Sequence, residues 1–333
     1  MPLLDSACLD YFADPSTFAD TINGSLFGGL PVVDWKSLVP DDSRLAGLAK
    51  GRGELGPIEE RLERDLLRRA VVKTQEGTTF AILGIENQST QDPVMPLRVM
   101  HYDAMTLHAA CRRLAREARR GSRPPDSDFL SGLPHGLKLP PVITLVIYWA
   151  PDRWTAPTSL HELLDLRDPA LRPIVPDYRI NLLQPCELTP ERRALFRTSV
   201  GSMLNYAKCM GNRAALERLL QEDDFFRRMD EPSANLALAL NAGAALRNIN
   251  LETYKTTEGY DMEDAWLDAM NYNRAQGLEQ GREQGLEQGR EETLRRTVEA
   301  MLEMGVSRDL VANMLTTKFN MTDLQVREHL ARA

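Results

Sequence analysis

Two apolar runs on either side of a short polar turn constrain the fold of this chain more than any other feature. Residues 66–74 and 78–85 are rich in β-branched side chains, and Gln75-Glu76-Gly77 lies between them. Apolar runs around a glycine-containing turn are typical of a β-hairpin. The sequence therefore predicts an antiparallel ribbon over this region.

The register of this hairpin decides which polar side chains meet at its open end. The simplest register places Gln75 opposite Thr78 across a two-residue turn. Counting outward, Asp65 then lies opposite Gln88, two residues from Glu86. Opposed residues share a face, as do residues two apart on one strand, so these three side chains would project together, roughly 5 to 7 Å apart. Two carboxylates and an amide in this arrangement can hold a divalent metal.

The same polar residues also fit a simpler interpretation. Polar side chains commonly end strands, so residues 86–89 could be the solvated exit from a buried strand. A three-residue turn would direct Asp65 to the other face unless a bulge restored the register. Spacing alone leaves both interpretations open.

A continuous β-branched run, Val142–Trp149, predicts a strand that is buried on both faces, as in the centre of a mixed or parallel sheet. Between the hairpin and this run, apolar residues at helical spacing predict a helix over 97–114. Two strands, a helix and a further buried strand in this order indicate an α/β core. We therefore expect an α/β fold with a mixed sheet flanked by helices, followed by an all-helical C-terminal region.

Several separated motifs carry a family resemblance. They are residues 18–24, 26–29, Asp65, 84–88, 95–100 and 102–104, followed by the strand 142–149 and the Gly-Arg-Glu-Gln repeats. In these motifs and their order the chain resembles the Rpn family of recombination-promoting nucleases and transposases, which belongs to the PD-(D/E)XK nuclease class. The resemblance implies a restriction-endonuclease-like mixed sheet as the core of the expected α/β fold.

The resemblance implies a DNA endonuclease that depends on Mg²⁺ or Mn²⁺ and is associated with recombination or transposition. Asp65 and Glu86 would hold the metal with the main-chain carbonyl oxygen of Asn87, since hard cations prefer oxygen ligands at about 2.1 Å. Gln88 would orient the attacking water. Asp20, on an early helix, is a further catalytic candidate by resemblance, although its side chain could equally cap the helix or face solvent.

Gln88 departs from the pattern of the wider nuclease class, which carries lysine at this position. A lysine ammonium orients water and offsets charge on the phosphate, whereas an amide orients water without a full positive charge. A catalytically degenerate nuclease fold that binds DNA or a partner protein is therefore the alternative function. Arg98 and Tyr102, an i, i+4 pair, belong to the substrate site by resemblance, and could instead pair with a carboxylate and pack in the core.

The overall charge gives no support to a nucleic-acid partner. The net charge is −8 and the pI is about 5.3, whereas proteins that bind phosphate usually present clustered cations. Six arginines nevertheless fall between residues 112 and 123, interrupted only by Glu117. This cluster fits either a solvated helix face or a phosphate-contacting surface.

Cysteine use and hydropathy predict the compartment. The four cysteines have no paired spacing, which argues against a zinc site or a disulfide framework. The acidic N-terminus does not resemble a secretory signal, and no apolar run approaches the roughly 20 residues that span a bilayer. We expect a cytoplasmic protein without a membrane partner.

The C-terminal third is helical in pattern and contains a four-residue repeat, 277–292, that reads GLEQGREQGLEQGREE. We interpret it as a helical connector, with a disordered linker as the alternative. The expected domains are a nuclease-like domain over 1–185, a helical subdomain over 186–272, the repeat connector over 273–296 and a small helical tail over 297–333. Repeat and tail could form a homo-oligomer, and a scaffold that only assembles subunits is a further alternative.

Overall fold

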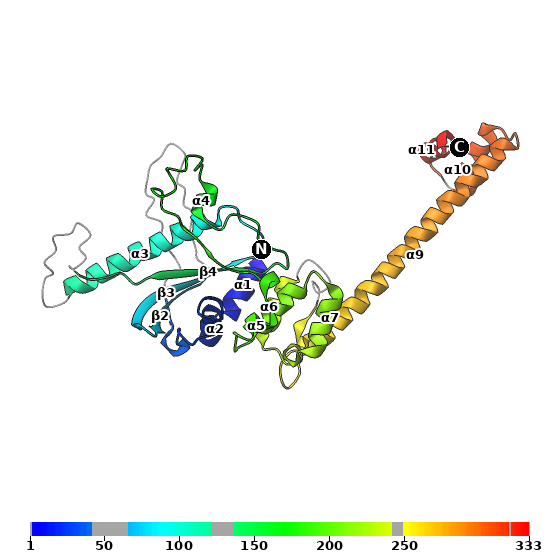
Figure 1. Cartoon of the computed structure of the whole chain (residues 1–333). Helices are drawn as coiled ribbons and strands as arrows, with labels where there is room; N and C mark the ends of the chain where they lie inside the picture. The colour runs from blue at the N-terminus through cyan, green and yellow to red at the C-terminus, as the bar shows by residue number, and fades with distance from the viewer. Residues whose placement is uncertain (1, 42–65, 121–135, 242–248, 320, 333) are drawn as a thin grey trace. The chain divides into compact units, whose positions relative to one another are not determined.

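A five-stranded mixed sheet in the order β1-β2-β3-β4-β5 forms the centre of the fold in the computed structural model (Figure 1). The structure describes residues 2–41, 66–120, 136–241, 249–319 and 321–332. β1 pairs with β2 and β2 with β3 in antiparallel fashion, whereas β3–β4 and β4–β5 are parallel. The strands are β1 Val39–Pro40, β2 Leu66–Thr74, β3 Gly77–Gln88, β4 Val142–Tyr148 and β5 Asn181–Leu183.

Helices flank this sheet and form the C-terminal region, so the expected α/β core with a helical tail is confirmed. The α-helices are α1 Pro2–Tyr11, α2 Pro15–Leu26, α3 Met95–Arg120, α4 Leu160–Leu163, α5 Pro190–Arg193, α6 Val200–Cys209, α7 Arg213–Glu222, α8 Glu231–Leu240, α9 Met262–Glu303, α10 Arg308–Phe319 and α11 Asp323–Arg332. Short 3-10 helices cover Trp35–Ser37, Pro185–Glu187, Asp224–Arg227 and Leu251–Tyr254.

The hairpin of β2 and β3 is confirmed, but its predicted register is wrong. Thr74 pairs with Gly77, so the turn is Gln75-Glu76. Gly77 has φ +150°, a conformation that L side chains rarely adopt, and this places the glycine directly after the turn. As a result, Leu66 lies opposite Ile85.

The error amounts to two residues along the ladder, because the predicted register would place Leu66 opposite Asn87. A shift of two keeps each side chain on its original face. Glu86 and Gln88 therefore still share a face of the sheet. Asp65, the third residue of the predicted metal group, lies outside the described residues.

α3 covers one face of the sheet. It links the parallel strands β3 and β4, and an α-helix is the usual crossover between such strands. Met95 and Val99 of α3 pack against Val146 and Tyr148 of β4, while Ala110 packs near the other end of the sheet, against Leu67 and Ile82. We call this side, which carries the even-numbered residues of β3, the α3 face.

α1 and α2 cover the opposite face (Figure 1). Arg68 of β2 is buried there, and its guanidinium donates hydrogen bonds to the carbonyls of Phe12 (3.0 Å) and Ala13 (2.8 Å). These contacts satisfy carbonyls just beyond the end of α1. Asp14 then caps α2 by accepting a hydrogen bond of 3.0 Å from the Thr17 N–H.

Residues 186–241 are helical, as predicted, apart from short connections. Their core contains large apolar residues that are fully buried, among them Leu204, Phe226 and Leu236. Tyr206 lies within this core and its ring contacts Phe226 at a centroid distance of 5.7 Å. Together with the sheet, these helices belong to one compact unit, residues 1–266.

Residues 267–333 form a second compact unit. Its core is an apolar cluster contributed by α9, α10 and α11, with Val298, Val311 and Leu315 fully buried. Among the described residues, no helix of either unit combines the length and apolar composition that crossing a bilayer requires.

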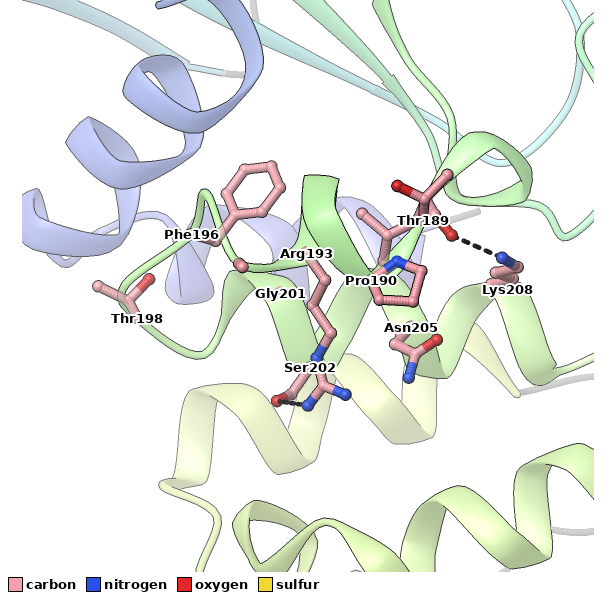
Figure 2. Close-up of a pocket in the computed structure, with 11 residues that line it drawn as sticks. Thr189, Pro190, Arg193, Phe196, Thr198, Gly201, Ser202, Asn205 and Lys208 are labelled. Atoms are coloured by element: carbon pink, nitrogen blue, oxygen red, sulfur yellow. Dashed lines mark hydrogen bonds between the residues drawn. The ribbon is translucent and has the colours of Figure 1, made fainter. Parts of the chain in front are cut away.

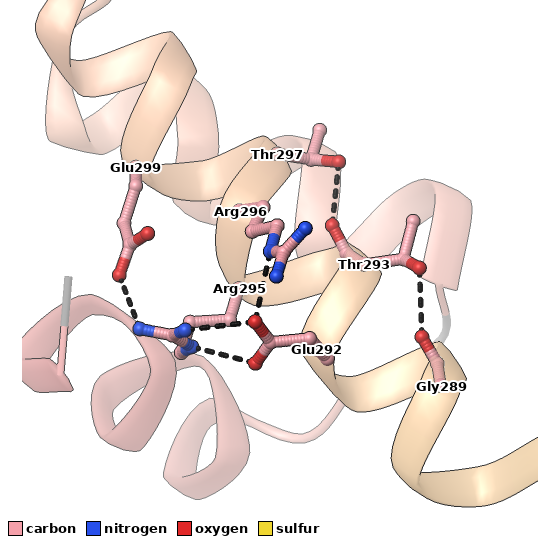
Figure 3. A network of polar contacts seen from close by, with 7 residues as sticks. All are labelled: Gly289, Glu292, Thr293, Arg295, Arg296, Thr297 and Glu299. Atoms are coloured by element: carbon pink, nitrogen blue, oxygen red, sulfur yellow. Dashed lines mark hydrogen bonds and ion pairs between the residues drawn. The ribbon is translucent and has the colours of Figure 1, made fainter. Parts of the chain in front are cut away.

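The four-residue repeat is helical throughout and forms part of α9. Within the repeat, Glu279 and Arg282 form an ion pair at 2.6 Å. A denser network follows the repeat, where Arg295 contacts Glu292 at 2.9 Å and Glu299 at 2.8 Å, as Figure 3 shows. Such exposed pairs stabilise a helix by only a few tenths of a kcal/mol each. The helix therefore gains little per turn until it reaches the apolar core of the second unit.

Candidate active site

Glu86 lies near the C-terminal end of β3, on the α3 face of the sheet. Its register partner on β4 is Val146, which packs against Met95 and Val99 of α3. The side chain is only 1% exposed. A buried carboxylate has lost the solvation that water provides, and such groups are found where charge or hydrogen bonds compensate for this loss.

Gln88 follows on the same face and is half-buried. Its main-chain carbonyl accepts a hydrogen bond of 2.8 Å from the N–H of Trp149, so this part of Gln88 is directed toward β4. Carbonyls alternate in direction along a strand. The Asn87 carbonyl is therefore directed toward the β2 side of the strand.

The Asn87 side chain points to the other face. Its Oδ1 accepts a hydrogen bond of 2.9 Å from the indole N–H of Trp149, and both residues are buried. The structure thus assigns the side chain of Asn87 to the α1/α2 side of the core. Of the two oxygens of Asn87, only the main-chain oxygen therefore stays a candidate for the predicted metal ligand.

A buried polar group on α3 lies beside this strand end. Asp103 is 4% exposed and accepts hydrogen bonds from the Thr144 hydroxyl (2.6 Å) and the Tyr178 hydroxyl. Thr144 pairs in register with Gly84, two residues before Glu86 on the same face. Asp103 therefore links α3 to β4 and to the segment before β5, next to β3, the strand that carries Glu86.

Arg98 and Tyr102 lie on α3 as the spacing predicted. Arg98 forms an ion pair of 2.6 Å with Asp92, and its guanidinium lies 5.9 Å from the centre of the Tyr102 ring. Burial disfavours the Arg98 charge, but the hydrogen bonds to Asp92 and Tyr102 outweigh this and raise the pKa of Arg98. The Tyr102 side chain is buried. This arrangement matches the packing alternative, while 38% of the Arg98 side chain stays exposed to a ligand.

Asp20 has structural contacts of its own. Its carboxylate accepts hydrogen bonds from the N–H groups of Arg197 and Thr198 and from the Thr198 hydroxyl, at 2.7 to 3.0 Å. Asn23, one turn later on α2, exchanges two hydrogen bonds with the main chain of Val33. α2 packs on the face opposite Glu86, so the structure does not bring Asp20 to the carboxylate of β3.

The remaining predicted ligand, Asp65, lies outside the described residues. Among the residues that are described, no three histidine, cysteine, aspartate or glutamate side chains are grouped closely enough to hold a metal. Of the predicted metal group, the described residues contain Glu86 and the Asn87 carbonyl.

A cavity of about 540 Å³ lies elsewhere, between α5 and α6 (Figure 2). Arg193 in its wall is bound to Asp223 and to Ser202, and Lys208 donates a hydrogen bond of 2.6 Å to the carbonyl of Leu188. No carboxylate lines it in the described part of the chain. Both cations are already engaged, so this cavity offers neither ligands for a hard metal nor a base.

Sequence reasoning did not assign roles to Asp103, Thr144 and Tyr178. The sequence signal that could have pointed to Asp103 is an acidic residue on the apolar side of a helix. Asp103 lies next to Tyr102 and one turn after Val99, and both of these residues are buried. The pairing itself could not be read from the sequence, since 41 and 75 residues separate Asp103 from its two partners.

Comparison with known proteins identifies the segment that contains this site. Residues 64–226 match the model of a family described as putative transposase, YhgA-like. Over this range the chain is similar to that family. The resemblance expected from the motifs is confirmed, and the family description associates the segment with transposition. No match was found among curated proteins or among solved structures.

The YhgA-like segment runs from just before β2 to the 3-10 helix after α7. It includes Asp65, Glu86, Gln88 and the Asp103 group. It excludes α1 and α2, and Asp20 with them, as well as the second compact unit. Among the described residues, the matched range thus contains Glu86, Gln88 and Asp103, which lie on the α3 face.

Proposed function

We propose that this protein is a metal-dependent DNA endonuclease that hydrolyses phosphodiester bonds during recombination or transposition. One observation carries the proposal: the YhgA-like segment places an almost completely buried carboxylate, Glu86, at the end of a central strand with Gln88 on the same face. Buried acids near a strand end are common in catalytic centres. The proposed compartment is the cytoplasm, because the four cysteines lack paired spacing.

Mg²⁺ or Mn²⁺ fits the oxygen donors at this position. Hard cations prefer carboxylate and carbonyl oxygens, which Glu86, Asp65 and the Asn87 main chain provide. A cation would also offset the desolvation of Glu86. When bound, the metal lowers the pKa of a water molecule and stabilises charge on the phosphate.

The chain's own groups would position the reacting atoms. Gln88 can orient a water molecule through its amide, which both donates and accepts hydrogen bonds. Asp103 fixes β4 and the Tyr178 segment against α3, and it therefore restrains the wall beside Glu86. Arg98 can contact a phosphate with the donors that Asp92 does not use, because a guanidinium carries five N–H groups.

A plasmid-nicking assay in Mg²⁺ or Mn²⁺ tests this proposal. Wild type should nick supercoiled DNA, while Asp65→Ala and Glu86→Ala should not. Glu117→Gln, which removes an exposed acid from α3, is the matched control and should retain activity. Equal nicking by wild type and both alanine variants would indicate a contaminant and end the proposal.

The second candidate function is a nuclease fold that binds DNA or protein without cutting it. The glutamine at position 88 favours this candidate, because an amide cannot neutralise charge on the phosphate as lysine does. Calorimetric titration with Mn²⁺ separates the two. Binding that Asp65→Ala abolishes supports the nuclease, and absence of binding in the wild type supports the degenerate fold.

Self-association through the C-terminal region is a separate proposal. Leu278 and Leu286 of the repeat are 67% and 57% exposed, which is unfavourable for a monomer in water. Sedimentation of wild type and a Leu278→Glu/Leu286→Glu variant tests it. A wild type that sediments as a monomer would contradict the proposal.

A further inference from the structure

The C-terminal half of α3 carries a row of arginines whose charges are not neutralised by described residues. Arg112, Arg116 and Arg120 are exposed and follow one another at intervals of four residues. None of them forms an ion pair within the described ranges, and the only side-chain contact in the row is from Arg116 to the carbonyl of Arg112 at 3.3 Å. We call these three residues the arginine row.

Other arginines on the same helix are used differently. Arg113 turns inward and lies 3.4 Å from Asp41, and Arg98 is paired with Asp92. Some exposed arginines of α9 have partners, as Arg282 and Arg295 show, whereas Arg274 and Arg290 form no ion pair among the described residues. The arginine row differs in that three exposed arginines without ion pairs follow one another at intervals of four residues on one helix.

The charge of α3 contrasts with that of the whole chain. Six arginines and two acids, Asp103 and Glu117, lie in Met95–Arg120, although the chain carries a net charge of −8. A local basic surface on an acidic protein is suited to a polyanion, because cations that contact phosphates release condensed counterions. The N-terminal half of the same helix covers Glu86.

We propose that the arginine row contacts the phosphate backbone of duplex DNA that enters the site at Glu86. The inference rests on the proposed function, since it assigns a binding surface to the same substrate. At 1.5 Å per residue, the row is about 12 Å long, and Arg116 lies about 27 Å along the axis from Arg98. Successive phosphates of one strand rise 3.4 Å, so the row spans three to four phosphates, roughly eight base pairs from the cleavage position.

Fluorescence anisotropy with a labelled 30-base-pair duplex tests the inference at several salt concentrations. The triple variant Arg112→Gln/Arg116→Gln/Arg120→Gln should bind about 10²-fold more weakly at 0.1 M salt. The slope of log K against log salt should become shallower by roughly 2 to 3, because each lost phosphate contact contributes about 0.9. Replacing all three residues with lysine should restore the slope.

Two controls show whether DNA binding depends on the position of the charges or only on their number. The variant Arg282→Gln/Arg295→Gln/Arg296→Gln removes the same charge from α9 and should bind like wild type. Far-UV circular dichroism should be unchanged for all triple variants, since the replaced side chains are exposed. Thermal unfolding should be unchanged for the α3 variant and only slightly lowered for the α9 variant, which loses weak ion pairs. Wild-type affinity and slope in the α3 triple variant would overturn the inference.

Other outcomes distinguish this inference from the proposed function. Glu86→Gln should bind the duplex with an unchanged salt slope, whether or not the wild type cuts DNA. A protein that binds through the arginine row and never nicks DNA would end the nuclease proposal alone. If the α3 triple variant instead lost binding only to vesicles containing phosphatidylserine, the row would serve a membrane surface and the inference would be wrong.

Discussion

Buried polar residues have different contacts on the two faces of the central sheet. On the α1/α2 face, Arg68 and Asn87 contact the main chain of α1's end and an indole N–H, respectively. On the α3 face, two of the buried polar residues that the structure describes are acids, Glu86 and Asp103, the latter bonded to hydroxyl groups of other elements.

This contrast distinguishes polar groups that stabilise the fold from those that can take part in catalysis. A side chain that satisfies main-chain carbonyls has its role fixed by the fold. A carboxylate near a strand end can in addition bind a metal through its oxygens. We therefore expect substitutions on the α1/α2 face to change stability, and substitutions on the α3 face to change activity as well.

The largest effect should come from the neighbours Glu86 and Asn87, which lie on opposite faces. Glu86→Gln should reduce nicking by at least about 10²-fold, since the charge that holds the metal is lost. Asn87→Ala should retain nicking per folded molecule because the main-chain carbonyl remains. Nicking rates normalised to folded protein measure both, and equal losses would remove the distinction between the faces.

Asp103→Ala should have the next largest effect. It leaves the hydroxyls of Thr144 and Tyr178 without their acceptor, and the free energy of unfolding should fall by about 2 to 4 kcal/mol. Urea denaturation measures this loss. Tyr178→Phe removes only one donor and should cost about 1 kcal/mol. A loss of activity in folded Asp103→Ala at saturating metal would mark it as a positioning residue.

Arg68→Ala should destabilise the protein by about 2 kcal/mol, because two carbonyls at the end of α1 lose a charged donor. Nicking per folded molecule should stay at the wild-type level. The adjacent Arg69 is 44% exposed and lies 3.6 Å from Asp41, so Arg69→Ala should change stability by less than about 0.5 kcal/mol. Similar costs for the two variants would contradict the contribution assigned to the buried guanidinium.

Asp14→Ala should cost less than Arg68→Ala, about 1 kcal/mol, through loss of the α2 cap. Burial alone would raise the pKa of Asp14, but hydrogen bonds from Ser16 and Thr17 outweigh it, and the pKa lies below its ordinary value. The stabilisation should therefore be complete above about pH 4 and disappear as the pH falls through the lowered pKa. Denaturation of wild type and variant at pH 7 and pH 3 measures the difference.

Local sequence patterns determined much of the fold. The hairpin, the strand 142–148, the helix α3 and the helical C-terminal region follow from periodicity, because an element's own side chains must form one buried face. The candidate residues Glu86 and Gln88 were found because a strand places alternate residues on one face. That relation survived a register error of two residues, since the period of a strand is two.

Tertiary structure alone decided what these residues meet. The Asp103 contacts with Thr144 and Tyr178, and the bonds from Asp20 to Arg197 and Thr198, join segments 41 to 178 residues apart. Periodicity specifies the face that an element buries, but not which distant element covers it. For that reason the sequence indicated an acid on a strand, while only the folded chain showed that Asp20 supports the scaffold and that Asp103 lies beside Glu86's strand.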